Sequence, residues 1–94
     1  MSDEKLFITF HDKDDILHFV ATCSKYDEAI DVKKDKQVTD AKSMMGMLLL
    51  QLEEPMEIIY DSYDEEKDGY EEFRRVILQE YDVQAVSAAK ESVS

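Results

Sequence analysis

Ser43 is the residue of this chain in which side-chain chemistry and position combine most clearly. It stands directly before the longest apolar run of the sequence, and a serine oxygen at a helix start accepts a hydrogen bond from an unpaired first-turn N–H. The helix would be apolar on two sides, one carrying Met44, Met45 and Leu48 and the other Met47 and Leu50, with Leu49 or Leu52. A short helix of a small protein cannot bury both sides. We expect one side to pack on the core and the other to meet a partner.

The two histidines and the single cysteine are the other side chains that could act as nucleophiles, acids or bases. His11 opens a polar turn that carries three aspartates. His18 lies off the apolar stripe of the helix that follows, so we expect a surface residue rather than a metal ligand or a base. Cys23 has no neighbouring feature that would lower the pKa of its thiol, and we expect it in the core.

The rest of the sequence contains no group of residues typical of catalysis or of cofactor binding. We find no pairing of a nucleophile with a base and no glycine-rich phosphate loop. Asp64 to Gly69 resembles the first half of a calcium-binding loop, but its twelfth position is Arg75, where a bidentate glutamate is needed. The acidic residues are better explained as a helix start. We therefore expect no metal, no cofactor and no enzymatic activity.

Composition narrows the class of partner. The 94-residue chain carries a formal net charge of −12, which argues against binding to nucleic acid or to an anionic membrane surface. Its apolar segments are too short for a signal peptide or a membrane span. A lone cysteine agrees with a reducing compartment. We expect a cytoplasmic domain that binds other proteins.

Sequence patterns predict the elements that would position these residues. Strands are expected over residues 5–10, 28–34, 36–39 and 56–60, where branched and aromatic residues gather or alternate. Helices are expected over residues 16–23, from Ser43 to a stop at Pro55, and over residues 65–81. Residues 1–82 would form the domain, and residues 83–94 would be a frayed or disordered tail.

This order of elements favours an α+β open-faced sandwich. We expect a four-stranded antiparallel sheet with three helices on one face, because helices on both faces of so small a sheet would leave one face exposed. The expected core contains Phe7 or Ile8, Ile16, Phe19, Val20, Ile30, Val32, Ile58 or Ile59, Phe73 and Ile77.

Three segments resemble a known family: Ser24-Lys25-Tyr26-Asp27, the run from Ala41 to Met47, and Met56-Glu57-Ile58. They are similar to HPr, the histidine-containing phosphocarrier protein family of the bacterial sugar phosphotransferase system. The resemblance extends from about Ser24 to Tyr81 without an evident gap. It implies the open-faced sandwich already expected from the order of elements.

The acceptor motif of that family is missing here. HPr carries its phosphoacceptor histidine before the first helix, in a Gly-(Ile/Leu)-His-Ala-Arg-Pro motif. When the chain is aligned by the resemblance, Asp12 occupies the histidine position, Asp14 the arginine position and Asp15 the proline position. These carboxylates already complement the positive end of the helix and would repel a phosphate. His11 lies one residue away and is the alternative acceptor.

The resemblance therefore implies an HPr-like regulatory module without phosphohistidine transfer. The family serine that Ser43 matches is the target of a regulatory kinase. The family residues that Met44, Met45 and Leu48 match form the docking patch for enzyme I, for the kinase and for a transcriptional regulator. A role in carbon catabolite regulation in the bacterial cytoplasm follows from this. The alternative is a phosphocarrier of the phosphotransferase system that uses His11.

Overall fold

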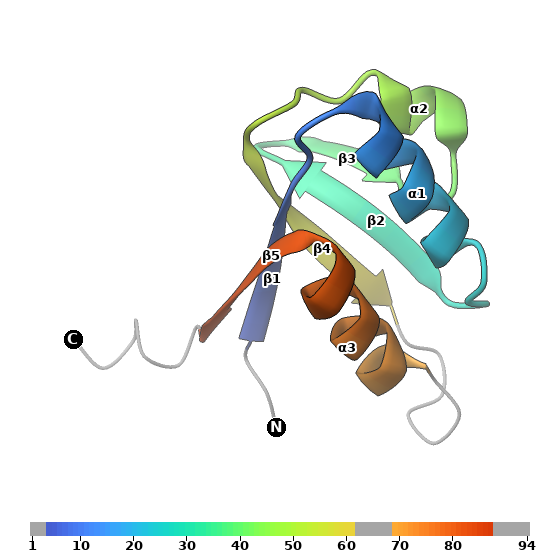
Figure 1. The fold of residues 1–94 in the computed structure, drawn as a ribbon, viewed down its shortest axis with the longest axis vertical. Coiled ribbons are helices and arrows are strands. Elements are labelled where there is room, and N and C mark those ends of the chain that lie inside the picture. The colour runs from blue at the N-terminus through green and yellow to red at the C-terminus, as the bar shows by residue number, and fades with distance from the viewer. Residues whose placement is uncertain (1–3, 62–68, 88–94) are drawn as a thin grey trace.

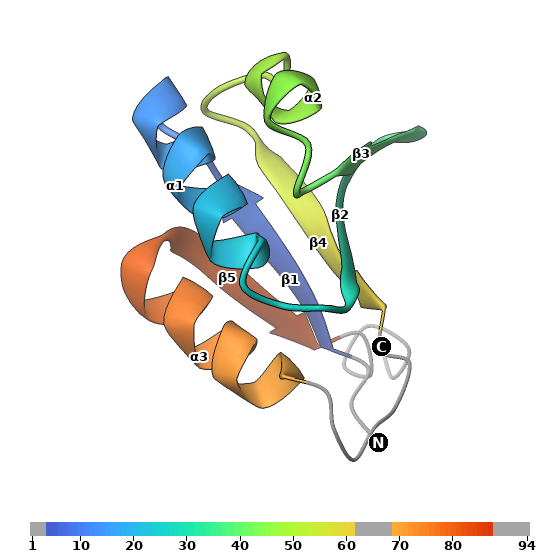
Figure 2. The same ribbon diagram turned by 90° about the vertical axis from the view of Figure 1, so that its right-hand side faces the viewer.

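The computed structural model describes residues 4–61 and 69–87 of the chain. These residues form, in order, β1 (Glu4–Thr9), α1 (Lys13–Cys23), β2 (Ala29–Lys34), β3 (Gln37–Asp40), α2 (Met44–Leu48), β4 (Pro55–Asp61), α3 (Tyr70–Glu80) and β5 (Asp82–Ser87). The strands make an open antiparallel sheet in the order β3-β2-β4-β1-β5. Helices α1 and α3 lie side by side over one face of it, and α2 lies beside the first half of α1 (Figures 1 and 2). The α+β open sandwich is confirmed.

Alternation along the strands sends one row of side chains to the helices. In β1, Leu6 and Ile8 are buried, and the register places them opposite Ile58 and Met56 of β4. The sequence left two core positions open, Phe7 or Ile8 and Ile58 or Ile59. The buried residues are Ile8 and Ile58. Every predicted core position is at most 6 % exposed: Ile8, Ile16, Phe19, Val20, Ile30, Val32, Ile58, Phe73 and Ile77.

Aromatic rings hold α1 and α3 together over the sheet. Phe19 of α1 lies with its ring centroid 5.4 Å from that of Phe10, 6.4 Å from that of Phe73 and 5.4 Å from that of Tyr81. The Tyr81 hydroxyl, at the end of α3, lies 2.9 Å from the hydroxyl of Thr22, the buried polar residue of α1. Edge-to-face aromatic contacts add about 0.5–1.5 kcal/mol each beyond the area they bury.

The sheet has five strands, so the prediction of four strands was wrong. The prediction of a frayed or disordered tail was also wrong for residues 83–87. These residues belong to β5, which pairs along the full length of β1. Val83 pairs with Ile8 on the core face, whereas Val86 pairs with Lys5 on the open face. Because the two valines lie on opposite faces, the strand shows no apolar alternation. Residues 88–94 lie outside the described residues.

Two helix boundaries also differ from the prediction. Helix α2 ends at Leu48 rather than at Pro55, which begins β4. The loop between them is bonded to the residue that follows β1, because the Glu53 N–H donates to the Phe10 carbonyl at 2.7 Å. Helix α3 is described from Tyr70. The predicted helix start at 65–68 and most of the calcium-loop-like segment lie among residues 62–68, outside the described residues.

Candidate functional site

Ser43 is the N-cap of α2, as the sequence predicts. Its backbone carbonyl accepts from the Met47 N–H at 2.9 Å, and its Oγ accepts from the Gly46 N–H at 3.4 Å. The second contact is long for a hydrogen bond and therefore weak. Ser43 is exposed, so its hydroxyl is accessible from solvent and is held loosely.

A glycine keeps space open beside this hydroxyl. A Cβ atom on Gly46 would lie 3.4 Å from Ser43 Oγ and 3.2 Å from the Thr39 Cγ2 methyl. The cation next in sequence is already engaged, because Lys42 Nζ donates to the Tyr26 carbonyl just beyond α1. This hydrogen bond connects the segment before α2 to the segment after α1. The Ser43 hydroxyl itself stays uncrowded.

The apolar side chains around α2 divide into a buried and an exposed set. Met47 is fully buried and joins the core. Met44 is 53 % exposed, Met45 82 % and Leu49 87 %, which is high for large apolar side chains. We call Met44, Met45 and Leu49 the α2 patch. Leu48, which was assigned to the exposed side, is half-buried against the core, and Leu49 directly after the helix projects in its place.

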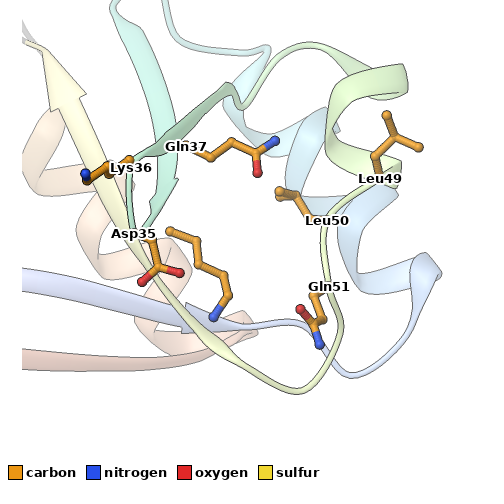
Figure 3. A pocket seen from close by; sticks show the side chains of 7 residues that line it. Asp35, Lys36, Gln37, Leu49, Leu50 and Gln51 are labelled. Carbon is orange, nitrogen blue, oxygen red and sulfur yellow. The ribbon is translucent and has the colours of Figure 1, made fainter.

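A pocket of about 610 Å³ adjoins the α2 patch (Figure 3). One wall is the turn between β2 and β3, at residues 34–37, and the other is the loop after α2, at Leu49, Leu50 and Gln51. Leu49 belongs to both the pocket and the patch. Sequence reasoning missed this hollow because its walls come from segments whose approach no local pattern encodes.

His11 lies at the junction of three segments. Its Nδ1 is 2.8 Å from Glu53 Oε1 in the loop after α2, and its Nε2 is 2.8 Å from Asp82 Oδ2 at the start of β5. Its backbone N–H donates to Asp15 Oδ2 at 3.0 Å. The hydrogen bond with Asp82, followed by that with Glu53, raises the pKa of the His11 imidazole above its ordinary value. The ring is about half exposed, with 49 % of its side-chain surface open to solvent.

Asp12, at the position of the family histidine, caps α1. Its Oδ1 accepts from the Asp15 N–H at 2.8 Å, and the residue is exposed. The helix start is therefore stabilised by an aspartate at the N-cap and by Asp14 and Asp15 in the first turn, as the sequence indicates.

The remaining candidate side chains have structural or surface positions. His18 is exposed on α1, with its Nε2 3.7 Å from Glu80 Oε1. Cys23 is fully buried, and burial raises the pKa of its thiol to about 12, which keeps it in the unreactive thiol form. The described residues contain no cluster of three or more His, Cys, Asp or Glu side chains suited to a metal ion. Within residues 4–61 and 69–87, none of the helices has the length and apolar character of a membrane span.

Comparison with protein-family models shows which family the chain resembles. Residues 16–77, well over half of the chain, match the model described as the HPr component phosphorylation site of the phosphotransferase system (PTS). The matched region contains Ser43 and all of α2, and it begins after His11 and Asp12. Searches of the curated proteins and of the solved structures each gave no match.

Proposed function

The chain belongs to the HPr family of the sugar phosphotransferase system, and we propose that it serves there as a regulatory binding module that carries no phosphate on a histidine. Members of this family are phosphocarriers that interact with other proteins of the system, not enzymes. The observation that supports the proposal is the environment of His11. Each of its two ring nitrogens lies 2.8 Å from a carboxylate oxygen, one of Glu53 and one of Asp82.

Phosphoryl transfer to imidazole requires a nitrogen lone pair and donors for the phosphate oxygens. At His11, the carboxylates of Glu53 and Asp82 each lie within hydrogen-bond distance of one ring nitrogen and favour the imidazolium cation. The cation has no nitrogen lone pair that could attack a phosphoryl group. The carboxylates of Asp12 and Asp15 stand close by and would repel an incoming dianion. Neither ring nitrogen is therefore ready to accept a phosphoryl group.

Ser43 is the residue at which regulation is proposed. Its exposed hydroxyl, its long bond to Gly46 and the space beside it suit modification by a protein kinase. A phosphate there adds a charge of about −1.5 to −2. Because the hydroxyl contributes little to the cap, the modification should leave the stability of the fold nearly unchanged. Its effect would fall on partners, because a dianion beside Met44 and Met45 weakens apolar docking and offers a site for arginines.

The α2 patch is the proposed docking surface, together with Leu48 at its half-buried edge. Two of its residues are methionines, whose flexible and polarizable side chains adapt to a partner's shape. The partners implied by the family are proteins similar to enzyme I, to the regulatory kinase or to a transcriptional regulator. A role in carbon catabolite regulation in the bacterial cytoplasm, without nucleic acid, membrane or cofactor, completes the proposal.

The test of Ser43 is incubation with an HPr kinase and ATP, followed by mapping of phosphate by mass spectrometry. We expect modification of the native chain at Ser43 and none in Ser43→Ala. Ordinary HPr in the same reaction shows that the kinase is active. If ordinary HPr is modified and this chain is not, Ser43 is a helix cap and the regulatory part of the proposal is wrong.

The test of His11 is incubation with phosphoenolpyruvate and enzyme I. We expect no acid-labile phosphate on the native chain. Acid-labile phosphate that is lost in His11→Ala and kept in His18→Ala would establish the alternative, a phosphocarrier with a relocated acceptor.

The test of the α2 patch compares the affinity of Met45→Asp with that of Val38→Asp for the kinase or for enzyme I. Val38 is 55 % exposed on β3, and pairing with Lys33 places it on the sheet face opposite the helices. We expect Met45→Asp to weaken binding about tenfold or more and Val38→Asp to leave it unchanged. Equal affinities of the two variants would contradict docking through the patch.

A further inference from the structure

We propose that His11 is a pH-sensitive latch that fastens β5 and the loop after α2 to the start of α1. The latch joins parts of the chain that are far apart in sequence, since His11 and Glu53 are 42 positions apart and His11 and Asp82 are 71. Asp82 is the first residue of β5, so the contact to it lies where the chain leaves α3 and begins the edge strand. This inference does not depend on the proposed function.

The geometry specifies the protonation state that closes the latch. An ionised carboxylate only accepts hydrogen bonds, and a neutral imidazole has one N–H and one lone pair. Glu53 and Asp82 each lie at 2.8 Å from a different ring nitrogen. Both contacts are hydrogen bonds only when both nitrogens carry a proton. Neutral His11 keeps one contact and turns a lone pair toward the other carboxylate.

The carboxylates that contact His11 favour this cation. Glu53 faces it from the loop after α2, Asp82 faces it from β5, and Asp15 of α1 accepts from its backbone N–H. Asp12 caps the same helix, whose exposed first turn also carries Lys13 and Asp14. In agreement, the pKa of His11 lies above its ordinary value of 6.5, first through the hydrogen bond to Asp82 and then through that to Glu53.

The direction of the pH dependence follows from the raised pKa. A group whose folded pKa exceeds its unfolded value stabilises the folded state fully below the unfolded value, and this stabilisation is lost as pH rises through the folded value. The latch is therefore closed below pH 6.5 and opens as pH rises through the higher pKa of folded His11. Strand β5 is the element that responds, because it is an edge strand held by β1 along one side.

The experiment measures protection of β5 amides against hydrogen exchange across the titration of His11. The ring C–H resonances of His11 report its pKa in the same samples. We expect protection factors in β5 to fall roughly two- to fivefold as His11 loses its proton, the range set by exposed ion pairs. Amides of β2 and β4, in the middle of the sheet, serve as the internal reference.

Three variants separate the latch from a general effect of pH. His11→Arg keeps a cation at every pH, and Asp82→Asn removes the charge of the β5 contact, so both should abolish the pH dependence of β5 protection. His18→Gln removes the other histidine of the chain and should retain it. Circular dichroism confirms that each variant is folded. The proposal would be overturned if the protection factors of β5 amides did not change as His11 loses its proton. It would also be overturned if Asp82→Asn retained the pH dependence of the native chain.

Discussion

Arg74 of α3 binds Glu4 of β1 through two parallel hydrogen bonds, from Nε to Oε1 at 2.7 Å and from Nη2 to Oε2 at 2.9 Å. The bidentate pair joins the last helix to the first strand. The hydrogen bond to Arg74 lowers the pKa of the Glu4 carboxyl below its ordinary value of 4.5. With side chains 34 % and 22 % exposed, the pair lies at the surface but is partly shielded.

We predict that this pair stabilises the fold at neutral pH and ceases to do so in acid. A lowered folded pKa means that the contribution is present above the unfolded pKa of Glu4 and is lost as pH falls through the folded value. Arg74→Gln should cost up to about 1 kcal/mol at neutral pH, because exposed pairs are screened by solvent. Urea unfolding at neutral pH and near pH 3 measures the difference, with exposed Arg75→Gln as the control. A cost for Arg74→Gln that is equal at both pH values would contradict the prediction.

Phe73→Ala should destabilise the domain by about 3–5 kcal/mol, the range for removing a large aromatic side chain from a core. Phe73 is fully buried, and its ring centroid lies 5.4 Å from that of Tyr26 and 5.1 Å from that of Tyr60. Chemical and thermal unfolding measure the loss, and Val76→Ala on the same helix, at a half-buried position, should cost less. A loss for Phe73→Ala well under 1 kcal/mol would contradict a role for Phe73 in the core.

Gly69→Ala should destabilise the protein because the added methyl group would crowd a neighbouring ring at the start of α3. Gly69 is the N-cap of α3, and a Cβ there would lie 2.9 Å from Tyr26 Cδ1 and 3.0 Å from Tyr26 Cε1. The Tyr26 ring packs edge-on against Phe73, so it cannot withdraw freely. Overpacking of this kind costs about 1–3 kcal/mol. Equilibrium unfolding tests it beside Glu71→Ala, an exposed change in the first turn of the same helix. A gain in stability for Gly69→Ala would refute the argument.

Asp12→His alone should not restore phosphoryl transfer from enzyme I. The substitution removes the N-cap of α1, at a cost of about 1 kcal/mol, and it places the new imidazole beside Asp14 and Asp15. No arginine stands at the matching position to hold the phosphate. Assay of acid-labile phosphate, with ordinary HPr as the positive control, decides the matter. Detectable transfer to this variant would defeat the electrostatic explanation.

Sequence patterns identified most of the fold because its central elements have one buried face. Ile16, Phe19, Val20 and Cys23 fall on one helical stripe, and all four are buried in α1. In β2 the alternation that brought Ile30 and Val32 to one side is the alternation seen. Burial on one side is the physical origin of such periodicity, so elements that have it can be read from the chain.

Where that asymmetry is missing, the sequence did not predict β5 and placed the end of α2 too late. Strand β5 sits at the edge of the sheet with its valines on opposite faces, and α2 ends inside an apolar run whose later residues serve the patch and the loop. The carboxylates around His11 escaped prediction for a different reason. Glu53 and Asp82 are ordinary acidic residues in an acidic chain, and only the tertiary fold brings them to one imidazole.

The position of β1 between β4 and β5 bears on how the chain acquires its structure. Although β1 precedes every other described strand, its two neighbours come from residues 55–61 and 82–87. Pairings so distant in sequence raise the contact order and slow folding relative to proteins with local contacts. During synthesis, β1 has no neighbouring strand to pair with until more than half of the sequence has been made. The β2–β3 hairpin and α1 can form before that time, whereas completion of the sheet must wait for its C-terminal strand.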